Sequence, residues 1–295
     1  MKRKISQALN SKGVLLSDGA WGTALQALGL KGGQCGEMWC TIKRHVILGI
    51  AKSYIDAGSD IILTNSFGAT SIKLAHYDLE DRAEKINRAA AQISREVAGD
   101  DRLVFGSVGP TGKIIMMGDV TEDELYESFA EQVVGLEKGG ADGILIETMS
   151  AIDEAAIAIR AAKENTVLEV GCTFTFERAG YGGYHTIMGH TIADYVDAMR
   201  DASVDYIGTN CGNGIDEITE IVRQMREIEP QLPIIAQPNA GKPEIVGGEI
   251  VYRETPEMMA AKVPELIEAG ANIVGGCCGT TPEHVKAMSG VLASM

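Results

Sequence analysis

The chain alternates between short hydrophobic runs and longer segments in which hydrophobic residues recur every three or four positions. The runs predict eight strands, at 13–19, 60–66, 102–108, 142–148, 167–176, 204–210, 232–239 and 271–278. The segments between them have helical spacing, and one of them opens with a capping box of Thr121 and Glu124. A strand followed by a helix, repeated along the chain, predicts an α/β fold with a parallel sheet.

Four similar tetrapeptides mark points where a predicted helix ends and a strand begins. They are "AGSD" at 57–60, "GGAD" at 139–142, "ASVD" at 202–205 and "AGAN" at 269–272. Glycine or serine in such a position is typical of a helix C-cap in a repeated unit. Eight units in 295 residues predict one domain, residues 1–295, folded as a (β/α)8 TIM barrel, because doubly wound sheets usually have fewer strands.

Composition narrows the setting of this barrel. The formal net charge of −15 and the absence of Lys or Arg runs argue against nucleic acid as a partner. No apolar stretch is long enough to span a membrane, and the basic amino terminus is followed by no signal-like apolar region. We therefore expect a cytoplasmic protein with no membrane partner, in which cysteines are reduced and serve in metal binding or catalysis.

Side chains that can bind a metal or a substrate follow the predicted strands, at the edge of the barrel where active sites form. They are Asp18, Glu147, Cys211, Asn239, Cys277 and Cys278. A carboxylate at a strand end can also cap the next helix, and this alternative stands for Asp18.

Three of the six cysteines are expected to converge at one point of the rim. Cys211 follows the sixth strand, and Cys277 and Cys278 follow the eighth. Small buried thiols filling gaps are the alternative, and a disulfide between neighbours would need a strained ring. Three thiolates repel one another unless a soft cation joins them, which favours Zn²⁺ with an open fourth position. Such a metal keeps a fourth thiol deprotonated, and this indicates thiol alkylation. Cys35 and Cys40 are weaker candidates for further ligands.

The motifs at these strand ends resemble the homocysteine S-methyltransferase family, and are most similar to the homocysteine-binding modules of cobalamin-dependent methionine synthases. They are "DGAWGT" (18–23), "LTNSFGAT" (63–70), "GPTG" (109–112), "IET" (146–148), "TNCG" (209–212), "PNAGKP" (238–243) and "GGCCGTTPEHV" (275–285). The resemblance covers the chain from about residue 10 to residue 290.

The resemblance implies a role for each matched position. Cys211, Cys277 and Cys278 match the zinc ligands, while Asp18 and Glu147 match acidic residues that receive the amino group of homocysteine. The loops that cradle the amino acid contain Gly19, Ala20 and Ser66, and Asn239 matches an asparagine that fills the open zinc position when substrate is absent. The acceptor would be homocysteine or another small thiol.

The methyl donor is left open by the resemblance. One barrel uses the 295 residues, so we expect the methyl group to come from methylcobalamin on a separate corrinoid protein. The alternatives are a methyltransferase that demethylates a small donor and passes the methyl group to a corrinoid protein or another thiol, and a noncatalytic zinc- or thiol-binding subunit. Residues 177–191, "ERAGYGGYHTIMGHT", depart from the family. We expect this loop to cover the mouth, with Tyr181, Tyr184, His185 and His190 lining the donor's approach.

Overall fold

The computed structural model describes residues 4–180 and 182–295, and its centre is an eight-stranded parallel sheet. Its strands follow the order β1-β12-β9-β8-β5-β4-β3-β2. Each strand lies within one predicted run, except that β4 extends one residue beyond its run, and several strands are shorter than predicted. Their bounds are β1 Leu15–Leu16, β2 Ile61–Leu63, β3 Leu103–Val108, β4 Gly143–Met149, β5 Glu169–Phe174, β8 Tyr206–Asn210, β9 Ile234–Gln237 and β12 Ile273–Val274.

Side-chain and backbone hydrogen bonds together close the sheet between β1 and β2, the two strands at the ends of this order. The Asp60 amide donates to Leu16 O at 2.7 Å, and the Leu16 amide donates to Asp60 Oδ2 at 3.0 Å. Further toward the carboxyl ends of the two strands, the Leu63 amide of β2 donates to Asp18 Oδ2 at 2.9 Å. The predicted (β/α)8 TIM barrel is therefore confirmed.

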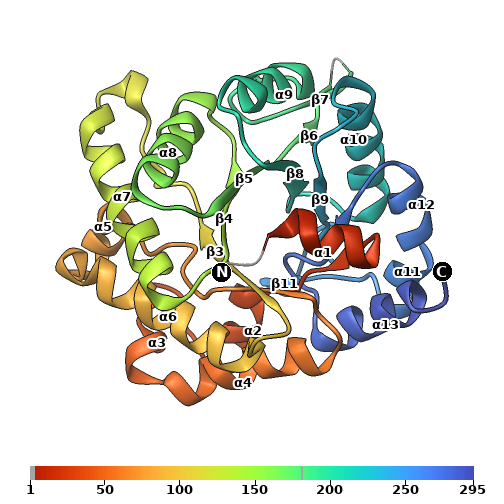
Figure 1. The fold of residues 1–295 in the computed structure, drawn as a ribbon, viewed down its shortest axis with the longest axis horizontal. Helices are drawn as coiled ribbons and strands as arrows, with labels where there is room; N and C mark the ends of the chain where they lie inside the picture. Colours follow the sequence, from red (N-terminus) through yellow and green to blue (C-terminus); the bar gives the residue numbers. More distant parts are fainter. Residues whose placement is uncertain (1–3, 181) are drawn as a thin grey trace.

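Helices surround these strands (Figure 1). Those that connect one strand to the next include α4 (Arg44–Asp56), α6 (Ala83–Ala98), α7 (Glu122–Gly139), α8 (Ile152–Asn165), α9 (Ile192–Asp201), α10 (Ile215–Ile228), α11 (Pro256–Ala261), α12 (Val263–Glu268) and α13 (Pro282–Leu292). Shorter helices lie in the loops: α2 (Trp21–Ala27), α3 (Trp39–Ile42) and α5 (Ser71–Leu74). The predicted capping box of Thr121 and Glu124 is present at the start of α7.

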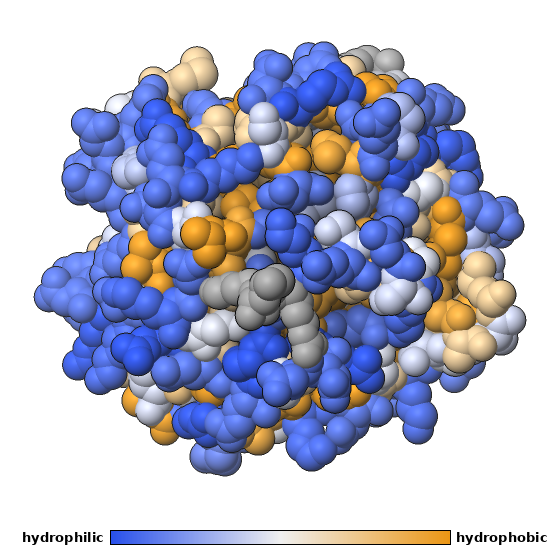
Figure 2. Space-filling model, in the orientation of Figure 1, coloured by the Kyte–Doolittle hydropathy of each residue, from blue (hydrophilic) through white to orange (hydrophobic). Residues whose placement is uncertain are grey.

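The amino-terminal helix α1 (Ile5–Lys12) covers the end of the barrel where the strands begin. Its Ile5 amide donates to Glu169 Oε2 at the start of β5, and the Ile5 side chain packs on the apolar barrel interior with Phe105 and Tyr206. Figure 2 shows this face covered mainly by hydrophilic side chains. Among residues 4–180 and 182–295, no helix is both long and apolar enough to cross a bilayer. The catalytic mouth of such a barrel lies at the other end.

The four tetrapeptides of the sequence form one repeated structure. Each contains a residue with positive φ at the helix end: Gly58 (110°), Gly140 (103°), Ser203 (52°) and Gly270 (118°). Two residues later, an Asp or Asn joins the preceding strand through both its backbone and its side chain. The backbone pairs are Asp60 with Leu16, Asp142 with Val104, Asp205 with Val170 and Asn272 with Ile234. Every second strand therefore begins with the same latch.

Two loops at the mouth carry their own hairpins. The loop after β5 contains β6 (Glu177–Arg178) and β7 (Tyr184–His185), and the loop after β9 contains β10 (Glu244–Val246) and β11 (Glu249–Val251). Both pairs are antiparallel.

Candidate metal centre and substrate site

The three predicted ligands meet at the mouth of the barrel. Cys211 lies directly after β8, and Cys277 and Cys278 lie three and four residues beyond the end of β12. Their sulfur atoms are within 4.8 Å of one another, and this is the one such group in residues 4–180 and 182–295. Cys211 has a left-handed backbone conformation (φ 63°), which is energetically unfavourable for a residue other than glycine. This conformation changes the direction of the chain at the end of β8, where the Cys211 side chain begins.

The spacing of the sulfurs suits a tetrahedral ion. Cys211 Sγ and Cys278 Sγ are 3.8 Å apart. A zinc ion about 2.3 Å from each of two sulfurs in tetrahedral geometry separates them by about 3.8 Å. The backbone on both sides of Asn239 contacts the cysteine loop, through Cys277 N to Pro238 O and Ala240 N to Cys278 O. Asn239 is buried and its Oδ1 has no hydrogen-bond partner among the described residues, so a role of this oxygen as a ligand stays a prediction. Three sulfurs and an unpartnered amide oxygen thus fit a zinc site.

Hydrogen bonds among the three thiols shift their pKa values. Hydrogen bonds from Cys211 and Cys277 lower the pKa of Cys278 to about 3. Hydrogen bonds to Cys211 and Cys278, together with burial, raise the pKa of Cys277 well above its ordinary value. The cluster therefore concentrates negative charge on Cys278, which favours a bound cation.

Asp18 lies at the end of β1 and is fully buried. Its Oδ2 accepts from Trp21 Nε1 and from the Leu63 amide, both at 2.9 Å, and its Oδ1 accepts from Ser17 Oγ at 3.2 Å. The helix-cap alternative is wrong, since α2 has no side-chain cap and Asp18 contacts the indole of Trp21 instead of the helix backbone. Burial raises the pKa of Asp18 to about 7.

Glu147 lies at a bulge near the end of β4. Two residues, Glu147 and Thr148, oppose the single Thr173 of β5, because Ile146 pairs with Cys172 while Met149 pairs with Phe174. Ser107 Oγ donates to Glu147 Oε1. Burial raises the pKa of Glu147 to about 7, and the nearby Asp18 adds to the effect. Neither Asp18, which is buried, nor Glu147, which is partly buried, has a cationic partner among the described residues, and such a pair of carboxylates is suited to bind an ammonium group.

The remaining predicted substrate residues are held by internal contacts. A Cβ at Gly19 would lie 2.8 Å from Tyr54 Cε1, so packing alone requires glycine there. The Ala20 amide donates to Thr280 Oγ1 at 3.1 Å, and Ser66 Oγ donates to Ser107 O at 2.7 Å. Contacts of Gly19, Ala20 and Ser66 with a substrate stay a prediction.

Two residues at the site were missed by the sequence analysis. Asn210, the last residue of β8, is buried between Glu147 and Cys277. Tyr252 hydrogen-bonds to Cys278, and burial raises the pKa of its hydroxyl. Asn210 precedes a ligand in "TNCG", which was a usable signal, whereas Tyr252 lies 26 positions from Cys278 and gave none.

One expectation needs correction, and one weaker alternative is excluded. Tyr184 does not line the mouth, since it is buried and its hydroxyl donates to Glu220 Oε2 of α10 at 2.9 Å. The hairpin of the 177–191 loop is thereby anchored to an outer helix, and Tyr181 lies outside the described residues. Cys35 and Cys40 are wrong as further ligands, because they are buried apart from the cluster, with their thiols directed to Glu37 Oε2 and Asn65 O.

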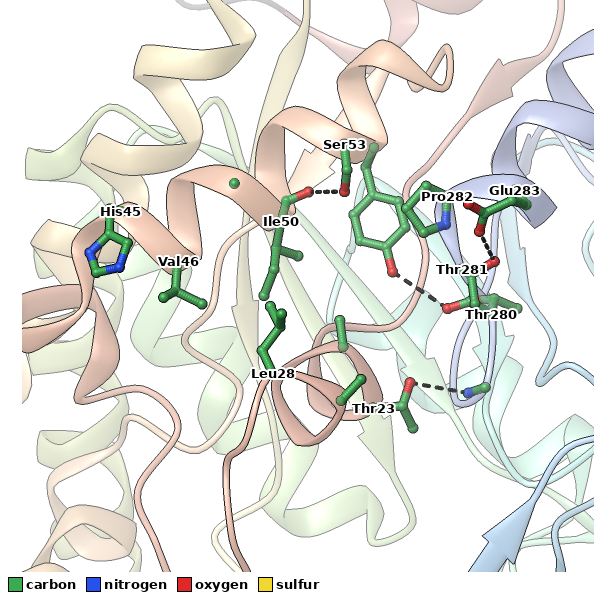
Figure 3. A pocket seen from close by; sticks show the side chains of 15 residues that line it. Thr23, Leu28, His45, Val46, Ile50, Ser53, Thr280, Thr281, Pro282 and Glu283 are labelled. Atoms are coloured by element: carbon green, nitrogen blue, oxygen red, sulfur yellow. Dashed lines mark hydrogen bonds between the residues drawn. The ribbon is translucent and has the colours of Figure 1, made fainter.

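A separate cavity of about 640 Å³ lies on the helix side of the loop that carries Cys277 and Cys278. Figure 3 shows Thr280, Thr281 and Pro282 on one side of it and Leu28, Val46 and Ile50 on the other. Thr280 also accepts from Ala20 through its Oγ1, so this side chain is shared by the cavity wall and the loop after β1.

A barrel with a cluster of three cysteines at its carboxyl-terminal mouth defines the class of protein, and comparison with known families specifies it. Residues 15–292 match the family model described as homocysteine S-methyltransferase. The chain belongs to the homocysteine S-methyltransferase family.

Individual relatives agree with this assignment. The chain is 30% identical to a methionine synthase of Mycobacterium tuberculosis over 97% of its own length, and 30% identical to that of Mycobacterium leprae over 95%. It spans about a quarter of the length of these relatives (25% and 24%). The metallated form of the homocysteine methyltransferase MmuM from Escherichia coli has the same fold, with a TM-score of 0.79, 23% identity, and coverage of 96% of this chain and 98% of that one.

Proposed function

We propose that this protein binds Zn²⁺ through Cys211, Cys277 and Cys278 and methylates homocysteine to methionine with a methyl group carried by a separate corrinoid protein. The observation that carries the proposal is the position of the three sulfurs at the same mouth as two carboxyl groups, the buried Asp18 and the partly buried Glu147. When bound, the zinc ion would supply the positive charge that keeps a fourth thiol ionised at neutral pH.

The chain's own residues would select an amino-acid thiol. Asp18 and Glu147 would hold its ammonium group, and binding of that cation would keep both carboxylates ionised despite their burial. Asn239 would occupy the fourth zinc position without substrate and yield it to the substrate thiol. A thiol without an amino group would leave two buried anions unpaired, which explains a preference for homocysteine.

For the methyl-transfer step, the protein has to position the thiol and the methyl donor, and it does not have to move a proton. The sulfur electron pair forms the new bond to the methyl carbon, while the bond between that carbon and its donor breaks and leaves its electrons on the donor. The thiol proton is lost before this step, so a general base is not required at the moment of transfer.

Exposed hydrophobic side chains around the mouth support a donor carried by a large partner. They lie on the loops after β2, β3, β5 and β9 and are Phe67, Met116, Met117, Ile187, Met188, Ile245, Val246 and Ile250. Met116 is 88% exposed, Ile245 82% and Ile187 81%. Apolar residues gathered on several loops at one end of a protein are typical of an interaction surface.

The proposal is tested with purified protein, zinc, homocysteine and methylcobalamin, free or bound to a corrinoid protein. We expect about one zinc per chain and formation of methionine. Cys277→Ala should release the metal, whereas Cys35→Ala, a matched change outside the cluster, should retain it. Donor demethylation without methionine would indicate a different acceptor, and neither reaction would indicate a noncatalytic subunit.

A further inference from the structure

The side chain of Asn210 uses nearly all of its hydrogen-bonding capacity at one point of the barrel. Its Oδ1 accepts from the Thr148 amide at 2.9 Å and from Thr173 Oγ1 at 2.8 Å. Its Nδ2 donates to Thr148 Oγ1 at 2.7 Å. The amide group is fully buried, so each of these contacts replaces a hydrogen bond to water.

These contacts hold an unfavourable piece of backbone. Thr148 has φ 62°, a left-handed conformation that a β-branched residue rarely adopts and that costs about 1–3 kcal/mol. Asn210 binds both the amide and the hydroxyl of Thr148, and thereby stabilises the bulge that places two residues opposite Thr173. The bulge directs the Glu147 side chain into the barrel while Met149 returns to the outer core.

The same amide nitrogen also faces a carboxyl group and a cysteine sulfur. Asn210 Nδ2 is 3.5 Å from Glu147 Oε2 and 3.8 Å from Cys277 Sγ. An amide donor placed between a carboxyl oxygen and a cysteine sulfur contacts both groups and fixes their separation. An aliphatic side chain of similar size could make neither contact.

We propose that Asn210 is a positioning residue that holds Glu147 at a fixed place relative to the cysteine cluster, so that the ammonium and thiol of one substrate are bound together. This inference rests on the proposed function, because it assumes that Glu147 receives the ammonium group. It assigns to Asn210 the selection of amino-acid thiols over thiols that lack the amino group.

The test compares two ligands of zinc-loaded protein by calorimetry: homocysteine and 4-mercaptobutyrate, which has the same thiol and carboxylate but no amino group. We expect Asn210→Ala to weaken homocysteine binding by at least about tenfold, as for loss of a well-placed charged contact. Binding of 4-mercaptobutyrate and zinc content should change by less than about twofold. Thr173→Val removes one donor to Asn210 Oδ1 with little change of volume, and should shift the ratio of the two affinities in the same direction by a smaller factor.

Asn87→Asp, a change at a buried asparagine of α6 that bonds only to backbone carbonyls, is the control and should leave that ratio unchanged. Equal losses for both ligands in Asn210→Ala, or no change in the ratio for Thr173→Val if Asn210→Ala does not fold, would overturn the inference. Wild-type protein that binds 4-mercaptobutyrate as tightly as homocysteine would overturn the proposed role of Glu147 and this inference with it.

Discussion

The ring of Tyr252 packs directly against the backbone of Gly279, the residue after Cys278. A Cβ at Gly279 would lie 2.2 Å from Tyr252 Cγ, and Gly279 has φ 81°. Only glycine leaves room for the ring at this point, and the ring brings the tyrosine hydroxyl to the Cys278 sulfur. Tyr252 thus connects the loop after β9 to the cysteine cluster.

We expect Tyr252→Phe to lower zinc affinity by about tenfold, because a hydrogen bond to a ligand sulfur is lost while the ring still fits over Gly279. Competition with a chromogenic chelator measures this affinity. Tyr77→Phe, at a half-exposed tyrosine outside the site, is the matched control. Unchanged zinc affinity in Tyr252→Phe would show that the hydroxyl does not support the metal.

Glu147→Gln and Asp18→Asn should each weaken homocysteine binding by about 1.5–3 kcal/mol, the usual effect of losing a hydrogen bond to a charged group. Zinc content should stay the same, since neither carboxylate belongs to the cysteine cluster. Calorimetry with zinc-loaded protein measures both. If both variants bound homocysteine like the wild type, the ammonium acceptor would have to be sought elsewhere.

The two carboxylates also predict a pH dependence of stability. Burial raises the pKa of Asp18 from 3.8 and that of Glu147 from 4.5, each to about 7. Between these limits the folded protein binds more protons than the unfolded chain, so the free energy of unfolding falls as the pH rises from about 4 to about 7. Urea titrations should therefore find Glu147→Gln more stable than the wild type at about pH 8 and not at about pH 4.5. An equal difference at the two pH values would contradict a raised pKa.

The repeated latch at the start of alternate strands predicts unequal effects of the same substitution. Asp142 is buried, accepts from the Val104 amide at 2.9 Å and pairs with Arg95, so Asp142→Ala should cost about 2–4 kcal/mol of unfolding free energy. Asp205 makes the same bond to the Val170 amide but is exposed. Asp205→Ala should cost about 1 kcal/mol. Equal losses in urea titrations would show that the latch bond, and not the buried ion pair, determines the effect.

The exposed side chains at the mouth predict how the donor arrives. Met116→Ser with Met117→Ser should slow methyl transfer from a protein-bound corrinoid by about tenfold or more, because apolar contact area with the partner is lost. Transfer from free methylcobalamin should be unchanged. Val167→Ser, at an exposed apolar residue just before β5 at the other end of the barrel, is the control. Equal rates with the protein-bound donor would argue against docking at these loops.

Much of the fold was predictable because each strand of a parallel barrel has a recognisable pattern within its own short stretch of sequence. Its strands are buried on both faces, so each is a short continuous hydrophobic run, and all eight runs became strands. The cysteine cluster followed from the same logic. Cys211, Cys277 and Cys278 lie at strand ends, and a barrel brings the carboxyl ends of its strands to one rim.

Other features depended on contacts between distant parts of the chain. The bulge at Glu147 is visible only from the pairing of β4 with β5, and the role of Asn210 depends on that bulge. The sequence of the 177–191 loop predicted that Tyr184 lines the mouth, yet its hydroxyl donates to Glu220 of α10. The spacing of hydrophobic residues and the position of a residue at a strand end depend on neighbouring residues, so both can be recognised in the sequence. The register of two strands, and the partner that a tyrosine or an asparagine selects, are decided by packing among segments tens of residues apart, and so only the tertiary structure determined them.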